Sequence, residues 1–313
     1  MERMDLPHSA ASHVSPSADE SLDLALDMGD LVLLDQVTET FDDLIAREQY
    51  RSGLLASLKQ ARLALGEGGK LRLTNTHQGV HDASYLERLE MLLRVAGFVD
   101  VAPQGGASGN LVEAVRRPAV LEEQEYGMVV RELVTPEDIR KSHEFAREYY
   151  FYKDYNYDYE VARQFDLHSD VYAVFDKSGE MVALARAAVR VPGYYCPFMY
   201  AVTEDGSHFR MPAYRRRVGE IMAIYKEGKS GVVAYKRLME FLTQYSFHIA
   251  HADTILTTYA VNDPYTGNYY KSKFMMEEAG AALTYRDFGG KWILLWTDKI
   301  LELSKLHRDL FRK

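Results

Sequence analysis

The sequence predicts an α/β fold in two parts, and three observations lead to this prediction. The chain has 313 residues, more than one average domain holds. Short apolar or β-branched runs alternate with stretches whose apolar residues have helical spacing. A polar and acidic segment after Pro118 separates two such series. We therefore expect a flexible leader at 1–20, an α/β domain at 21–118, a linker at 119–126 and a mixed-sheet α+β domain at 127–313.

In the first domain, strand and helix signals alternate from the start. The apolar run Leu31–Leu34 ends at Asp35 and is typical of a buried strand. The signals that follow predict a helix over 54–65, a strand over 70–74, a helix over 85–95 and strands over 98–101 and 111–115. Gly97 is suited to end the second helix. Such alternation favours a mostly parallel sheet.

The second domain begins with a strand over 128–134. Thr135 and Pro136 form a strong helix start, with a hydroxyl cap and a proline in the first turn. The remaining signals predict a helix to about 150, a hairpin over 171–191, a strand over 218–225, a helix over 232–245, a strand over 254–261, a helix from 264 to about 279, a hairpin over 282–297 and a C-terminal helix.

Composition excludes several classes of protein. The formal net charge of −9 argues against a nucleic-acid binder. Cys196 is the only cysteine, so an intrachain disulfide and a cysteine zinc cluster are impossible, and no metal is expected. We expect Cys196 to be a small buried residue and the chain to be cytoplasmic. No stretch of 18 apolar residues exists, and the N-terminus has no secretory apolar segment.

A glycine-containing turn follows the strand over 218–225. It reads Lys226-Glu-Gly-Lys-Ser-Gly231 and leads into the helix over 232–245. Small residues allow a phosphate to approach the backbone, and the N–H groups of a helix N-terminus favour an anion. The two lysines would add positive charge. The alternative is an ordinary polar loop between strand and helix.

This turn, together with the order of elements over 128–299, resembles the GNAT superfamily of acyltransferases. Lys226 stands where that family usually has Arg or Gln, Lys229 replaces its first glycine, and Gly231 matches its second. The resemblance implies that the strand holds the pantetheine arm of acyl-CoA and the turn holds its pyrophosphate. The implied donor-binding residues are Ile224, Tyr225, Lys226, Gly228, Lys229, Ser230, Gly231, Val232 and Asn262.

A second segment that resembles the family runs from Asn262 to Phe274. In many members, a tyrosine of this helix protonates the departing thiolate, and Tyr269 is the matching position. Tyr270 is the neighbour that can be confused with it. Lys273 departs from the pattern, because glycine is common there. The alternative is that both tyrosines pack or line a pocket.

An incoming ammonium must lose a proton before it attacks a carbonyl. Glu220, on the strand that leads into the turn, is our first candidate for this general base. The alternative is a solvated residue or an ion pair, with Arg217 as a partner. His248 and His251 are interpreted as loop histidines.

Part of the second domain resembles the autoinducer synthases and the related N-acyl amino acid synthases. Asp166 and Asp170 match an acidic motif of that branch loosely, whereas Arg186 and Glu220 match it better. The resemblance implies a long acyl chain, a donor that is often acyl carrier protein, and an amino acid or derivative as acceptor. Arg186 would anchor a substrate carboxylate or serve as a structural ion-pair partner.

Tyrosines and arginines suggest further contacts. The run that contains Tyr152 and Tyr155 lies where this fold covers the acceptor pocket, so these rings would grip a substrate or pack the helices. The arginines of 215–217, with Lys226 and Lys229, would steer an acidic carrier protein or form a solvated edge.

The first domain resembles the second half of a Rossmann-type methyltransferase. Nothing before Leu31 can be the glycine-rich turn that binds the nucleoside cofactor, so we expect a truncated domain used for scaffolding or docking. Its exposed sheet edge would fit a homodimer. The sequence therefore predicts an N-acyltransferase that acts on an amine. The alternatives are a catalytically inactive binding or assembly module and, third, a methyltransferase.

Overall fold

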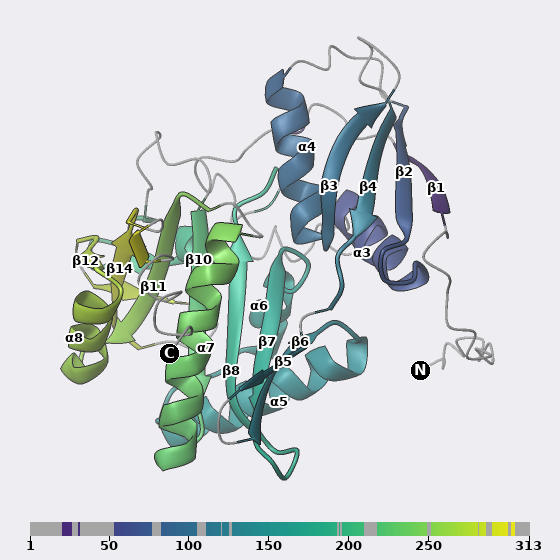
Figure 1. Ribbon diagram of the computed structural model, residues 1–313. Helices are drawn as coiled ribbons and strands as arrows, with labels where there is room; N and C mark the ends of the chain where they lie inside the picture. The colour runs from purple at the N-terminus through teal and green to yellow at the C-terminus, as the bar shows by residue number, and fades with distance from the viewer. Residues whose placement is uncertain are drawn as a thin grey trace, which may run out of the picture.

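The computed structural model describes residues 21–26, 31, 53–76, 83–104, 111–119, 121–124, 127–192, 194, 196–209, 218–248, 252–280, 282–285, 290–299 and 302–303. These residues form a four-stranded sheet and a ten-stranded sheet (Figure 1). The expected leader and most of the strand expected over 31–34 lie outside the described residues. Of the expected C-terminal helix, only residues 302–303 are described, and they are helical.

The first sheet has the strand order β1-β2-β4-β3. Its strands are β1 (Ser21–Leu26), β2 (Lys70–Asn75), β3 (Phe98–Gln104) and β4 (Leu111–Arg116). Only β1 and β2 are parallel, whereas β4 is antiparallel to both β2 and β3. The expectation of a mostly parallel sheet is therefore wrong. The chain between β3 and β4 is too short for a crossover, so the two strands pair as antiparallel neighbours.

Two helices pack with this sheet, α3 (Leu54–Ala64) and α4 (Ala83–Val95), as their apolar spacing predicts. Leu55 and Leu58 of α3 are fully buried, as is Leu89 of α4. Gly97 has a φ of +92° and donates its backbone N–H to the Arg94 carbonyl at 3.0 Å. Only glycine adopts that conformation freely, and the expected end of α4 at this position is confirmed.

The second sheet is mixed, as predicted. Its order is β5-β6-β7-β8-β10-β11-β14-β13-β9, and β12 pairs with β14. The strands are β5 (Leu121–Gln124), β6 (Met128–Leu133), β7 (Ser169–Phe175), β8 (Met181–Val189), β9 (Val202–Thr203), β10 (Val218–Tyr225), β11 (Thr254–Ala260), β12 (Glu277–Glu278), β13 (Leu283–Thr284) and β14 (Trp292–Thr297). All its neighbours are antiparallel except β10 and β11, which are parallel.

Different helices cover the two faces of this sheet. They are α5 (Pro136–Tyr152), the short α6 (Tyr159–Ala162), α7 (Lys229–His248) and α8 (Pro264–Lys273). Ala146 of α5 belongs to the same buried cluster as Leu184 of β8, whereas Leu238 of α7 belongs to the cluster of Ala183 and Ala185. Side chains that alternate along β8 thus meet helices on opposite faces.

Several boundaries differ from the expected ones. Helix α7 extends from Lys229 to His248 instead of covering 232–245, so the expected loop position of His248 is wrong. Part of the expected linker forms strand β5, which pairs antiparallel with β6, because Gly127 reverses the chain with a φ of +70°. Helix α8 ends at Lys273 rather than near residue 279. Met275 has a φ of +50°, which a helix does not allow, and β12 pairs with β14 instead.

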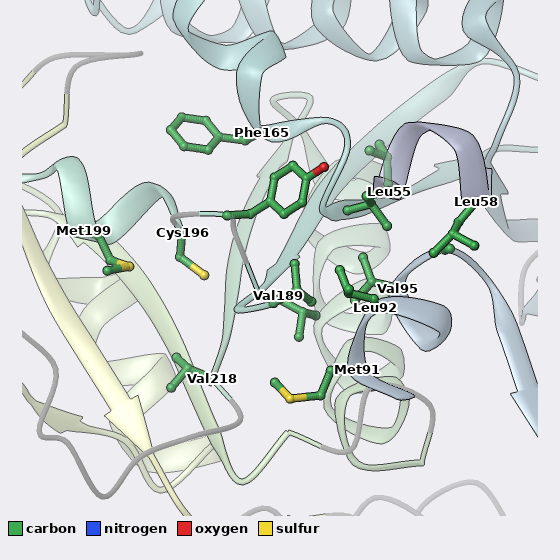
Figure 2. Close-up of a cluster of buried hydrophobic side chains, with 14 of the residues drawn as sticks. Leu55, Leu58, Met91, Leu92, Val95, Phe165, Val189, Cys196, Met199 and Val218 are labelled. Carbon is green, nitrogen blue, oxygen red and sulfur yellow. The ribbon is translucent and has the colours of Figure 1, made fainter. Parts of the chain in front are cut away.

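One apolar cluster joins the two sheets. Figure 2 shows Leu55 and Leu58 of α3 and Leu92 of α4 beside Val189 of β8 and Cys196. Cys196 is fully buried, as expected. Burial of apolar surface is worth about 25 cal/mol per Å², so this shared cluster contributes to the stability of both sheets.

A buried group of charges also links the two sheets. The guanidinium of Arg117, just after β4, donates two hydrogen bonds of 3.0 Å to the carboxylate of Glu132 on β6. Arg62 of α3 lies 2.8 Å from the same carboxylate, and Asp170 of β7 lies 3.9 Å from Arg117. Burial acts against the charge of Arg117, but the nearby Tyr172, Glu132 and Asp170 outweigh it and raise the pKa of Arg117.

Helix α5 starts as the sequence predicts, and its cap can be tested. The Thr135 hydroxyl accepts a hydrogen bond from the Asp138 amide at 3.1 Å. Replacing Thr135 with alanine is expected to lower the free energy of unfolding by about 1 kcal/mol, because this amide loses its partner. Urea unfolding should show the loss, and Thr135→Ser should largely retain the native value. Equal stability of all three proteins would contradict a stabilising cap.

Candidate active site

Strands β10 and β11 run side by side and then separate. They pair in parallel from Val218 opposite Thr254 to Ile221 opposite Thr257, and the pairing ends there although both strands continue. On its other edge, β10 stays paired with β8 as far as Tyr225. Along 222–225, the β10 edge that faces β11 therefore has backbone groups that no described strand uses, and such groups require another partner.

A cavity of about 280 Å³ lies at this separation, and we call it the wedge cavity. Its walls come from α5, β10, α7, β11, α8 and β14, so it reaches both faces of the sheet. Tyrosines dominate it. The residues that matter for the argument are Tyr149, Tyr155, Tyr225, Tyr235, Asn262 and Tyr270.

The glycine-containing turn follows β10 directly, and α7 begins at Lys229. Gly228 has a φ of +112°, which favours glycine. Gly231 lies against the turn, and a Cβ atom added there would stand 1.8 Å from the Lys226 carbonyl oxygen. The first turn of α7 thus lies close to the end of the wedge where β10 stops. The first N–H groups of a helix lack helical partners, and here the first such bond runs from the Val232 N–H to the Gly228 carbonyl at 3.2 Å.

The charges of this turn are partly used within the protein. Lys226 forms an ion pair with Glu180, and Glu227 forms one of 2.8 Å with Lys153 at the end of α5. These pairs are exposed, so each contributes little to stability. Lys229 is exposed on the first turn of α7. Lys226 thus has a carboxylate partner on the protein, whereas Lys229 has no ion-pair partner among the described residues.

The structure separates the two adjacent tyrosines of α8. Tyr269 packs against Tyr235 and Phe274, at ring distances of 6.4 and 5.6 Å, and lies outside the wedge cavity. Tyr270 is 1% exposed, lines the wedge cavity and shares a hydrogen bond with the Tyr235 hydroxyl. Of these two tyrosines, Tyr270 therefore faces the wedge cavity and Tyr269 does not, since consecutive helical residues point about 100° apart.

Glu220 is placed differently from the expectation. It is fully buried, and its carboxylate accepts hydrogen bonds of 2.8 Å from the Phe198 amide and from the Tyr285 hydroxyl. It lines neither the wedge cavity nor the second cavity described below. Burial, and then the proximity of Glu220, raise the pKa of the Cys196 thiol. Arg217, its expected alternative partner, lies outside the described residues.

A second, smaller cavity lies between α5 and the sheet, and we call it the α5 cavity. It has a volume of about 40 Å³, and Tyr150, Tyr157, Arg186, Met222 and Ile224 are among its lining residues. The ring of Tyr150 contacts those of Tyr149 and Tyr155 in the wedge cavity, at 5.3 and 6.4 Å. The two cavities are therefore neighbours, separated by tyrosine rings.

The residues expected to contact the substrate also differ in whether they line a cavity. Arg186 forms an ion pair of 3.2 Å with Asp166 and donates to the Ala162 carbonyl at 2.9 Å, so the structure shows the ion-pair role. Tyr155 lines the wedge cavity, and its hydroxyl lies 3.4 Å from the Asn262 side-chain oxygen. Tyr152, the last residue of α5, is 79% exposed and lines neither cavity, because it is not on the buried face of the helix.

The expected donor-binding residues do not all face the wedge. Tyr225 and Asn262 line the wedge cavity. The Ile224 side chain points into the α5 cavity, because alternate residues of a strand face opposite sides. Ser230 and Val232 are exposed on the first turn of α7. Ile224 can therefore contact a donor in the wedge only through its backbone.

The sequence reasoning missed a hydrogen-bonded chain beside the α5 cavity. His143 of α5 is buried, with Nδ1 2.5 Å from the Tyr157 hydroxyl and Nε2 2.8 Å from Asp166 Oδ2. The signal was present, because His143 lies at helical spacing from Ala146 and Tyr150 on the buried face of α5.

The described residues show neither a metal site nor a membrane-spanning helix. Among the described residues, no group of three His, Cys, Asp or Glu side chains is placed to hold a metal ion. None of the helices in the described part of the chain combines the length and the apolar character needed to cross a membrane. His251 and the arginines of 215–217 lie outside the described residues, as does the side chain of His248.

Comparison with known proteins gives similarity at the level of solved structures. No protein-family model and no curated protein matches the chain. An N-acyl amino acid synthase from uncultured soil microbes, FeeM, is 14% identical over 56% of this chain and 92% of its own, with a TM-score of 0.42. A dodecameric spermidine N-acetyltransferase from Vibrio cholerae is 15% identical over 57% of this chain and 98% of its own, with a TM-score of 0.36. A ribosomal-protein-S5-alanine acetyltransferase from Vibrio fischeri is 14% identical over 57% of this chain and 96% of its own, with a TM-score of 0.38.

Proposed function

We propose that the chain is an N-acyltransferase of the GNAT type, which moves an acyl group from a pantetheine thioester to an amine. The observation that carries the proposal is the separation of the parallel strands β10 and β11, directly followed by the glycine-containing turn and α7. The family resemblance of that turn, and of the segment from Asn262 to Phe274, supports the same conclusion.

The wedge has the groups that a pantetheine donor needs. The free β10 edge along 222–225 offers N–H and C=O groups to the amides of the pantetheine arm. The unpaired N–H groups at the start of α7 suit the pyrophosphate of CoA, since a helix N-terminus attracts negative charge. The donor is therefore acyl-CoA, and acyl carrier protein, which presents the same arm, is the alternative.

The reaction is a direct transfer without a covalent enzyme intermediate. The amine nitrogen bonds to the thioester carbonyl carbon, the C–S bond breaks, and the sulfur leaves as a thiolate that takes up a proton. Tyr270 is the proposed proton donor. Burial raises the pKa of Tyr270, so its hydroxyl keeps its proton at neutral pH. Glu220 acts as a positioning residue that holds Tyr285 and the backbone at Phe198.

The first sheet has a supporting role in this proposal. The buried side chains of α3 and α4 complete the apolar cluster behind β8, as scaffolding requires. The Lys59 ammonium of α3 donates to the backbone carbonyls of Asp166 and Ser169, at 3.2 and 2.9 Å. The first sheet thus supports the segment that carries Asp166, which pairs with Arg186 at the α5 cavity.

Titration calorimetry with acetyl-CoA and octanoyl-CoA, followed by turnover assays, tests this function. We expect both donors to bind and Tyr270→Phe to lower kcat by roughly 100-fold with donor affinity unchanged, because a proton donor acts in the transition state. Tyr269→Phe is the matched control, since it removes a hydroxyl outside the wedge, and it should leave kcat near the native value.

Two results would contradict the proposal at different levels. Loss of activity in Tyr269→Phe, with Tyr270→Phe active, would return the proton donor to the position that the sequence indicated. Absence of binding to every CoA thioester and to acyl carrier protein would overturn the enzyme assignment. The chain would then be an inactive binding or assembly module.

A further inference from the structure

We propose that Tyr157, His143 and Asp166 form the proton relay that deprotonates the acceptor amine, which deepens the proposed N-acyl transfer and rests on it. Transfer to an amine releases a proton from nitrogen, so a base must lie within reach of the attacking atom. Glu220 does not meet this requirement, because its carboxylate is fully buried, bonded to Phe198 and Tyr285, and lines neither cavity.

The three side chains come from separate segments and meet in one line. His143 lies on the buried face of α5, Tyr157 follows α5, and Asp166 follows the turn after α6. The distances are 2.5 Å from the Tyr157 hydroxyl to His143 Nδ1 and 2.8 Å from His143 Nε2 to Asp166 Oδ2. A hydroxyl, an imidazole and a carboxylate in this order form an arrangement in which the imidazole can take the hydroxyl proton and the carboxylate stabilises the imidazolium. The Tyr157 oxygen can then accept a proton from the amine.

The surroundings hold this line in place. The edge of the Tyr159 ring meets the imidazole at 4.9 Å, and Tyr150 stacks on Tyr157 at 5.6 Å. Arg186 binds the second oxygen of Asp166 at 3.2 Å. With Nε2–H donated to Asp166, Nδ1 is the acceptor for the Tyr157 proton, so the carboxylate fixes the tautomer that the relay requires.

Of the three residues, Tyr157 is the one that faces the site. It lines the α5 cavity with Tyr150, whose ring contacts Tyr149 and Tyr155 of the wedge cavity. In this proposal the amine occupies the α5 cavity against Tyr157, and its nitrogen reaches a thioester in the wedge past the Tyr150 ring, where the two cavities adjoin. Tyr157 is the catalytic residue of the relay, and His143 and Asp166 are positioning residues that act through it.

The proton balance of the step is complete. As the amine nitrogen forms its bond to the carbonyl carbon, its proton moves to the Tyr157 oxygen. The original Tyr157 proton moves to His143 Nδ1, and Asp166 stabilises the imidazolium. The leaving thiolate takes its proton from the Tyr270 hydroxyl, and Tyr270 regains one from solvent. After the product departs, His143 returns its proton to the Tyr157 oxygen, and Tyr157 releases the proton that came from the amine to solvent. One proton is released and one is taken up, so no oxidant or further reactant is needed.

Steady-state acyl transfer tests the relay, with acetyl-CoA as donor and a panel of spermidine, tyramine and the common amino acids as acceptors. We expect His143→Gln and Tyr157→Phe each to lower kcat by roughly 100-fold or more, with the KM and calorimetric Kd for acetyl-CoA unchanged. The double variant should be no slower than either single variant, because residues that act as one unit are non-additive. Tyr159→Phe keeps the ring against His143 and should retain native turnover.

The outcomes separate this proposal from the one on which it rests. If acetyl-CoA fails to bind the native chain, the proposed function fails and the relay fails with it. If acetyl-CoA binds and native turnover is present, but His143→Gln stays within about threefold of the native kcat, only the relay is overturned. Multiplicative losses in the double variant would also overturn it, because they would indicate two independent roles. Thermal unfolding of each variant confirms that a loss of kcat is not a loss of folded protein.

Discussion

Replacing Glu132 with glutamine is expected to lower the free energy of unfolding by about 3–5 kcal/mol. Glu132 is 3% exposed, and its carboxylate is bonded to Arg117 and lies 2.8 Å from Arg62. Glutamine has almost the same shape but no charge. Two buried guanidinium groups would then lose the carboxylate that they share, and Arg117 would retain Asp170 at 3.9 Å. A buried charge that loses its partner is among the most costly changes in a protein interior.

Glu113→Gln provides the matched control for this prediction. Glu113 pairs with Lys70 and Arg72 at 3.4 and 3.6 Å, but Glu113 is only partly buried and both cationic side chains are exposed to solvent. Its loss should change stability by less than about 1 kcal/mol, because exposed ion pairs contribute little. Urea unfolding of both variants measures the difference. Equal losses in the free energy of unfolding at Glu132 and Glu113 would show that the buried ion pairs contribute no more to stability than the exposed ones.

Replacing Gly231 with alanine is expected to weaken acetyl-CoA binding by roughly 100-fold, equivalent to about 2.7 kcal/mol. The added Cβ atom would stand 1.8 Å from the Lys226 carbonyl oxygen, which is backbone and cannot swing aside. Either the turn or the start of α7 must therefore shift. Such a shift moves the N–H groups that we assign to the pyrophosphate.

Gly219→Ala, on the strand β10 that leads into this turn, is the control for this second prediction. A Cβ atom there would meet the Ala252 Cβ at 3.7 Å, an ordinary contact. Calorimetry should therefore give near-native affinity for Gly219→Ala. If Gly231→Ala binds acetyl-CoA as tightly as the native chain, the turn at Lys226–Gly231 does not hold the pyrophosphate.

The order of helices and strands was largely predictable because it depends on local patterns. Thr135 and Pro136 mark the start of α5, and the alternating residues of Lys70–Asn75 mark β2. Strand direction was harder to predict. Antiparallel pairing of β4 with β2 depends on contacts between distant segments, and no pattern within Leu111–Arg116 encodes it.

The candidate site was also predictable only where it depends on residues that are neighbours in the chain. The sequence predicted the strand, the turn and the helix around Gly231, because these are neighbours in the chain. It proposed Glu220 as base and Tyr269 as acid, and neither residue lines the wedge cavity or the α5 cavity, since a linear motif does not show which side chains face a cavity. The chain of Tyr157, His143 and Asp166 forms only when α5 and the segment after α6 fold onto each other.

One apolar cluster determines whether the two sheets can fold independently. It contains Leu55, Leu58 and Leu92 together with Val189 and Cys196. Opening α3 locally uncovers these leucines and, at the same moment, removes neighbours of the strand that flanks β10. The two sheets therefore belong to one cooperative unit. A cut near residue 118 would therefore leave apolar surface exposed on the remaining piece, which we expect to be less stable than the full chain.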